Sequence, residues 1–245
     1  MMNNRITLNF REFGQSSDPK VVGIRDGGGQ IIFDDLFFHS HPHFTSVFFP
    51  DVLMDKDWWK KWAKWEEYGS KLLHIKLAKT AILTDYIGAS GLFRCFFVNS
   101  KLKEILQTAN LPNHNFFEIT FIQGGKIVDG YWWFCFDLET GENTVDFSKC
   151  EYNLRDHKRT FGENFSVNIQ SYQDYLNVFY ETGKAIKVTE LVFNSNFNSE
   201  LDIFGTQFLT NQVYISENLH KKLQEQNITG YTASYPTFGL DLVVC

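Results

Sequence analysis

Two stretches of the sequence repeat one pattern at an offset of 117 residues, so that Phe97 aligns with Tyr214 (214 − 97 = 117). They read "FFVNSKLKEILQTANLPNHNFFEI" and "QVYISENLHKKLQEQNITGYTASY", and in both the apolar residues recur at helical spacing after a short β-branched and aromatic run. A chain that carries one pattern twice is expected to fold it twice. The sequence therefore predicts a duplicated strand–helix–strand unit over residues 97–119 and 214–235.

Both copies also carry signals for the ends of the helix. Asn99 and Ser216 occupy the same aligned position, and either side chain can accept hydrogen bonds from the free amides of a first helical turn. Asn110 and Asn227 follow the last periodic residues, and asparagine tolerates the left-handed backbone that ends many helices. The two predicted helices should therefore begin and end at equivalent residues.

The segment between the copies favours strands. "FFEITFIQGGKIVDGYWWFCFDLETGENTVDF" separates aromatic runs by glycine-containing turns, which is typical of an antiparallel meander. "SYQDYLNVFYETGK" predicts a further helix, and "AIKVTELVF" predicts a further strand. Strands outnumber helices without strict βαβ alternation. This indicates an α+β fold with a mixed or mainly antiparallel sheet, a few packed helices and the duplicated unit.

The N-terminal part is rich in aromatic residues and histidine. Two β-branched runs in "VVGIRDGGGQIIFDD" flank Gly27, Gly28 and Gly29 and predict a hairpin. "DKDWWKKWAKWEEYG" predicts a tryptophan-rich helix. We therefore expect an N-terminal subdomain over residues 1–85 and an α+β core over residues 86–245, with the two subdomains sharing a sheet.

Composition limits the class of partner. The 245-residue chain has a formal net charge of -6, whereas nucleic-acid binding normally needs a concentrated basic surface. Cys95, Cys135, Cys150 and Cys245 form no CxxC pair, so free thiols in a reducing cytosol are expected. No signal-peptide core occurs at the start, and no uncharged stretch approaches the ~20 residues that span a bilayer. We expect a soluble cytoplasmic protein that binds neither nucleic acid nor membrane.

Three histidines at alternate positions raise the question of a metal site. In "FFHSHPHF", His39, His41 and His43 would point to one side of a strand, and imidazoles are common zinc ligands. Pro42 opposes a regular strand, because it lacks the backbone donor that a central strand needs. The favoured interpretation is an aromatic loop with polar residues and no metal or other cofactor. A metal-dependent hydrolase built on the three histidines is the alternative.

Several motifs, taken in order, resemble one protein family. They are "TAILTDYIG", "FFVNSKLKEIL", "GYWWFCFDLETGENTVDF", "LDIF" and "NQVYISENLHKKLQEQNITGYTASYP". Over about residues 80 to 240 they resemble immunity protein family eleven of bacterial polymorphic toxin systems, and the similar family forty-three. The positions that match the family motifs, and to which the resemblance gives a mainly structural role, are Asp85, Leu102, Tyr131, Asp202, Phe204, Ser216 and Leu219.

The sequence also departs from that family pattern. "VNS" stands where "VSE" is usual, the central strand ends in "FCF" without the usual asparagine, and residues 1–78 carry none of the motifs. The resemblance implies a cytoplasmic protein that binds a cognate secreted toxin domain and blocks it, with no catalytic activity of its own.

Aromatic and acidic side chains would suit a basic protein partner. The candidate contact residues are Trp58, Trp62, Trp65, Asp129, Asp137, Glu139 and Asp146. The tryptophan stripe is also the pattern of a buried helix face, which is the favoured interpretation of those three residues. The four carboxylates could pair as a catalytic acid and base, but their turn and strand-edge positions favour solvated surface groups. A scaffold protein that uses the duplicated unit as a homodimer surface is a further alternative.

Overall fold

The computed structural model describes residues 6–25, 29–33, 39, 75–88, 96–155, 165–182, 185–206, 209–210, 212–236 and 241–244. The elements in chain order are β1 (Ile6–Thr7), β2 (Phe10–Gln15), α1 (Pro19–Val22), β3 (Ile31–Ile32), β4 (Ile75–Leu77), β5 (Tyr86–Gly88), β6 (Phe96–Asn99), α6 (Ser100–Gln107), β7 (His114–Gln123), β8 (Lys126–Phe136), the 3-10 helix η2 (Phe147–Lys149), β9 (Glu151–Arg155), β10 (Phe165–Ser166), α7 (Tyr172–Thr182), β11 (Ala185–Phe193), β12 (Ile203–Gly205), β13 (Val213–Ser216), α8 (Glu217–Glu225), β14 (Tyr231–Ser234) and β15 (Asp241–Val244).

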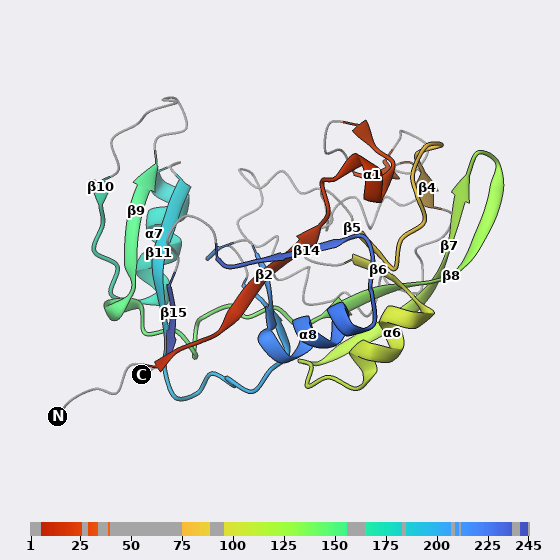
Figure 1. Ribbon diagram of the computed structural model, residues 1–245. Coiled ribbons are helices and arrows are strands. Elements are labelled where there is room, and N and C mark those ends of the chain that lie inside the picture. The colour runs from red at the N-terminus through yellow and green to blue at the C-terminus, as the bar shows by residue number, and fades with distance from the viewer. Residues whose placement is uncertain are drawn as a thin grey trace.

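The strands form three sheets. Sheet A has the order β1-β15-β11-β9-β10, sheet B has β12-β13-β2-β14, and sheet C has β3-β4-β7-β8-β6-β5. Figure 1 places β9 and β11 at the left of the view and the β7–β8 hairpin at the right, with β2 and β14 between them. Only the β11–β15 and β4–β7 pairs are parallel among the described strands. The predicted α+β fold with mainly antiparallel pairing is confirmed.

The duplicated unit is confirmed, and it is larger than the sequence predicted. β5, β6, α6 and β7 recur as β12, β13, α8 and β14, each displaced by 117 residues at its first residue. The strand registers agree as well, because Tyr86 pairs with Val98 and Ile203 pairs with Ile215. We call residues 85–136 the first repeat, and residues 202–234 together with β2 the second repeat.

A fourth strand completes the sheet of each repeat, but the two strands come from different parts of the chain. β8 lies between β6 and β7 in sheet C and follows β7 through a tight turn at Gly124 and Gly125. β2 lies between β13 and β14 in sheet B and arrives from the N-terminal side. Their positions correspond, since Phe134 pairs with β6 as Phe13 pairs with β13.

One apolar core lies between the repeats. Alternate side chains of the strands point to it, and leucines spaced four residues apart in α6 and α8 cover it. Its buried members are Phe13, Tyr86, Phe96, Val98, Leu102, Leu106, Phe134, Phe136, Ile203, Val213, Ile215, Leu219, Leu223 and Ile228. Phe97 points instead into a core of sheet C, and Tyr214 into a core beside sheet A. The repeats thus share one core and each faces a different second core.

The hairpin predicted around glycines 27–29 is wrong in its first strand. Val21 and Val22 lie in α1, because Asp18 accepts a hydrogen bond from the Lys20 amide at 2.9 Å and Pro19 suits the first helical position. Gly23 ends the helix with a φ of 74°. The second β-branched run does form a strand, β3, which pairs with β4. Residues 26–28 lie outside the described residues.

Strands from residues 1–85 enter all three sheets, through the β1–β15, β2–β13 and β4–β7 pairs. The boundary between residues 85 and 86 stays a prediction. The tryptophan-rich helix predicted around residues 55–69 lies outside the described residues. None of the helices that the structure describes is long and apolar enough to cross a membrane.

Candidate functional site

Asp85 of the first repeat ties the two repeats together. Its Oδ1 accepts a hydrogen bond at 2.7 Å from Nδ2 of Asn99, the residue whose side chain caps α6. Its Oδ2 accepts from the backbone N–H and from the hydroxyl of Thr229, both at 2.7 Å, in the loop that follows α8. Asp85 is buried, so these donors replace the water that its carboxylate has lost.

Asp202 makes the reciprocal link 117 residues later. Its Oδ1 accepts a hydrogen bond from the hydroxyl of Ser216, the cap of α8, at 2.5 Å. Its Oδ2 accepts from the backbone N–H of Asn110 at 2.9 Å, in the loop that follows α6. Each aspartate therefore joins the start of its own helix to the loop after the other helix. We call Asp85 and Asp202 the aspartate latches.

The other positions that match the family motifs also support the fold. The Tyr131 hydroxyl donates a hydrogen bond to the Thr84 carbonyl at 2.8 Å, and burial together with the nearby Asp85 charge raises the pKa of Tyr131 to about 12. Tyr131 is therefore a protonated donor at neutral pH. The remaining positions are buried side chains, Leu102, Phe204 and Leu219.

Two of the predicted contact carboxylates lie at opposite ends of β8. Asp129 is exposed near the hairpin tip and accepts a hydrogen bond from the Thr120 hydroxyl at 3.2 Å. Asp137 is exposed just after the strand and accepts from Nδ2 of Asn113 at 3.1 Å. With a rise of ~3.3 Å per residue, the two side chains are about 26 Å apart. They cannot form one acid–base pair.

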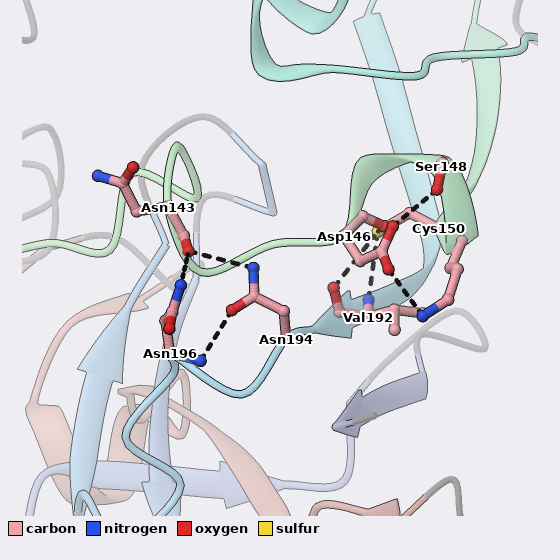
Figure 2. Close-up of polar contacts among 8 residues, drawn as sticks. Asn143, Asp146, Ser148, Cys150, Val192, Asn194 and Asn196 are labelled. Atoms are coloured by element: carbon pink, nitrogen blue, oxygen red, sulfur yellow. Dashed lines mark hydrogen bonds and ion pairs between the residues drawn. The ribbon is translucent and has the colours of Figure 1, made fainter. Parts of the chain in front are cut away.

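The other two carboxylates brace the loop between β8 and β9. Oε1 of Glu139 accepts hydrogen bonds from the Gly141 amide at 2.8 Å and from the Thr144 hydroxyl at 2.6 Å. Figure 2 shows Asp146 beside Ser148, whose Oγ lies 2.7 Å from Oδ1. Oδ2 of Asp146 lies 2.8 Å from Lys149 Nζ. The hydrogen bond from Lys149 is the main reason that the pKa of Asp146 is lowered.

Asparagine and cysteine side chains fix this loop to the end of β11 (Figure 2). The Asn143 carbonyl accepts hydrogen bonds from Nδ2 of Asn194 and Nδ2 of Asn196, each at 3.1 Å. The Val192 amide donates to Sγ of Cys150 at 3.2 Å. Burial raises the pKa of the Cys150 thiol, so it is not an activated nucleophile. The polar groups of this cluster therefore hold the loop in place.

The histidine and tryptophan candidates fall largely outside the described residues. His39 is described and exposed, whereas His41, His43, Trp58, Trp62 and Trp65 are not among the described residues. Within the part of the chain that the structure describes, no group of three or more His, Cys, Asp or Glu side chains is placed to hold a metal ion.

Among the described residues, polar side chains line the following two surface grooves. One, of about 300 Å³, lies between α6 and α8, where Ile105 comes close to Lys222, its counterpart at the 117-residue offset. Its lining is Lys101, Glu104, Ile105, Thr108, Lys222, Glu225 and Gln226. The other, of about 450 Å³, lies over β9 and is lined by Cys150, Glu151, Tyr152, Asn153, Ser166, Val167, Asn168 and Thr189.

The first repeat also has a longer hairpin than the second, and Figure 1 shows this hairpin extending past α6 at the right of the view. On one side of its outer half, Glu118, Ile127 and Asp129 are exposed. We call this side the arm face and define it by Glu118, Thr120, Ile122, Ile127 and Asp129. Of these residues, Asp129 was predicted as a contact and the others were not. The signal that could have found them is the alternation of outward residues with the buried Ile119 and Phe121.

The chain matches the Immunity protein family (Imm11) over residues 34–233, and it belongs to this family. The match begins well before the motifs that suggested the family, and it includes the tryptophan-rich segment. No curated protein matches the chain significantly.

Proposed function

We propose that this protein binds a cognate secreted toxin domain in the cytoplasm and neutralises it by protein–protein inhibition, without catalysing a reaction. The observation that supports the proposal is membership of the immunity family over residues 34–233. Among the described residues, those that match the family motifs act in packing and in the aspartate latches, and the proposal assigns none of them a catalytic role. The metal-dependent hydrolase has no support beyond the spacing of His39, His41 and His43.

The experiment is a growth rescue. Each toxin candidate encoded beside this gene would be induced in a susceptible host, with and without this chain. We expect one candidate to stop growth alone and to be tolerated when the chain is present. A toxin of another system serves as the control and should kill in both conditions. If every neighbouring candidate kills equally with and without the chain, the proposed function is wrong.

A titration then separates binding from catalysis. Purified toxin activity would be measured against increasing amounts of the chain. A stoichiometric inhibitor removes activity in proportion to the amount added, and the toxin regains activity and keeps its mass when the complex is dissociated. Complete loss of activity at one-hundredth of an equivalent, with a lasting mass change in the toxin, would show an enzyme instead. Light scattering on the free chain and the complex shows whether the chain acts as a monomer or a homodimer.

A further inference from the structure

We propose that the toxin docks on the arm face, and that the toxin surface presents basic side chains around an apolar centre. The proposal rests on the proposed function and names the surface that would carry it. It differs from the sequence expectation, which spread the contacts over four carboxylates and three tryptophans.

Strand alternation makes the arm face an outward surface. Ile119 and Phe121 of β7 are buried in the core on one side of sheet C, so Glu118, Thr120 and Ile122 point to the other side. On β8, Ile127 pairs directly with Ile122, and Asp129 receives its hydrogen bond from Thr120. α6 packs against the same side of the sheet nearer its centre, and the arm face lies beyond that helix.

A row of three isoleucines, interrupted by Lys76, runs from β3 onto the arm face. The register places Ile32 opposite Lys76, Lys76 opposite Ile122, and Ile122 opposite Ile127, so these side chains share one side of four neighbouring strands. Ile127 is 68% exposed and Ile32 is 42% exposed. Exposed isoleucines in a row on a sheet provide an apolar centre for a protein interface.

Carboxylates lie beside this row. Glu118 and Asp129 are exposed, and among the described residues neither forms an ion pair. The neighbouring Lys103 has its Nζ over the Trp132 ring, 4.1 Å from the centroid, which leaves the two carboxylates for a partner. A partner with lysine or arginine side chains beside an apolar patch complements this arrangement, and the chain's net charge of -6 would attract it.

The second repeat shows that a repeat does not need this extension to complete its sheet. β14 ends at Ser234, the counterpart of Phe117, whereas β7 continues to Gln123. The next residue, Tyr235, is the counterpart of Glu118, and the Arg11 guanidinium lies 4.3 Å from its ring centroid, although the side chain is 67% exposed. At this position the first repeat therefore carries a carboxylate and the second an aromatic ring that already contacts a cation.

The groove between α6 and α8 is the rival surface. It carries two cations and two anions, Lys101, Lys222, Glu104 and Glu225, so its net charge selects neither a basic nor an acidic partner. Its lining also includes only one apolar side chain, Ile105, whereas the arm face has Ile127 and Ile122 and is continued by the exposed Ile32 of β3.

The test measures the affinity of full-length variants for the toxin identified by growth rescue, used in a catalytically inactive form. We expect Ile127→Asp to weaken binding at least 100-fold and Glu118→Lys with Asp129→Lys to weaken it at least tenfold. Two controls match these changes. Leu83→Asp places a charge at an apolar residue that is 45% exposed in the loop on the opposite side of sheet C, and Glu104→Lys with Glu225→Lys reverses the charge in the rival groove. Both controls should bind within twofold of wild type.

A measurement on the unmodified complex guards against misfolded variants. Hydrogen exchange of the wild-type chain with and without toxin should show new protection in β7 and β8 around residues 116–130. Wild-type affinity in the arm-face variants, or protection confined to α6 and α8, would overturn the docking surface while the growth rescue still upheld the proposed function. Failure of the rescue itself would overturn both.

Discussion

The two repeats have the same sheet order and register, yet they differ in what surrounds them. The first has a ten-residue β7 and an eleven-residue β8, whereas the second has a four-residue β14 and a six-residue β2. The first repeat packs its second side against a core with β3 and β4, and the second packs against sheet A and α7. Equivalent residues thus hold the shared centre, and the differences lie at the periphery, where we place the toxin.

The largest expected effect comes from truncating equivalent leucines in the core that the two repeats share. Leu106 and Leu223 are buried counterparts in the core between the repeats. Because each Leu→Ala change leaves a cavity, we expect Leu106→Ala and Leu223→Ala each to reduce the free energy of unfolding by about 3–4 kcal/mol. Urea unfolding followed by tryptophan fluorescence measures both. A loss below about 1 kcal/mol at one site alone would mean that the repeats do not share the core equally.

The two aspartate latches should contribute unequally to the free energy of unfolding. Asp85 is buried and accepts three hydrogen bonds, whereas Asp202 is partly exposed and accepts two. We expect Asp85→Ala to cost about 3 kcal/mol of unfolding free energy and Asp202→Ala about 1.5 kcal/mol. The same urea experiment applies, with Asp129→Ala, an exposed aspartate, as a control that changes stability little. A larger loss of unfolding free energy in Asp202→Ala than in Asp85→Ala would show that Asp85 is not the stronger link.

Exchanging the helix caps gives a smaller effect. Asn99→Ala and Ser216→Ala should each cost about 1 kcal/mol, because each removes a side chain that accepts the amide of the third helical residue. If the caps are equivalent, Asn99→Ser and Ser216→Asn should each recover about half of that loss. Thermal unfolding monitored by circular dichroism measures all four variants. Exchanged caps no better than alanine would show that each aspartate requires its own partner.

The smallest effect concerns Arg11 and Trp132, which occupy equivalent positions on β2 and β8. Arg11 donates to both oxygens of Glu217, at 2.7 and 3.0 Å, and this hydrogen bonding lowers the pKa of Glu217. A lowered carboxyl pKa stabilises the fold above the unfolded pKa of about 4.3, and that contribution is lost as the pH falls through the folded pKa. Because the Glu217 side chain is still 36% exposed, solvent screens the pair, and Glu217→Gln should cost only about 0.5 kcal/mol at pH 7.

The measurement is the stability of wild type and Glu217→Gln between pH 3 and pH 7, and the difference between them should shrink below about pH 4. Lys103→Met in the first repeat is the matched control. Its stacking on Trp132 involves no carboxylate, so its cost should not change over that range. If the stability difference between wild type and Glu217→Gln does not change with pH, the ion pair between Arg11 and Glu217 is not its cause.

The sequence predicted what short-range physics decides. The helices of the repeat followed from leucine spacing and from the caps Asn99 and Ser216, and the structure places both helices there. The failed strand at Val21 and Val22 shows a local conflict, since β-branched residues favour strands but Asp18 starts a helix directly before them. A prediction that weighed the cap above the β-branched run would have found α1.

The sequence did not predict what depends on contacts between distant segments. Nothing in Phe10–Gln15 resembles β8, and its place in sheet B is set by partners about 200 residues away in β13 and β14. Asp85 and Asp202 were found through the family motifs, but their crossed bonds to Thr229 and Asn110 join opposite repeats and leave no local pattern. The arm face could not be predicted because the sequence does not show which half of the β7–β8 hairpin is covered by α6.

During synthesis, β2 emerges long before β13 and β14, the two strands with which it pairs. The ribosome releases β2 early, but β14 follows only about 200 residues later, which is roughly 10–40 s of synthesis at typical elongation rates. The β7–β8 hairpin pairs with itself and can fold long before then, while β2, with Phe10 and Phe13, has no sheet to join. In the proposed role, a newly made chain would protect its cell only after β14 has been synthesised. An early strand with open edges is a hazard that nascent-chain chaperones would have to cover.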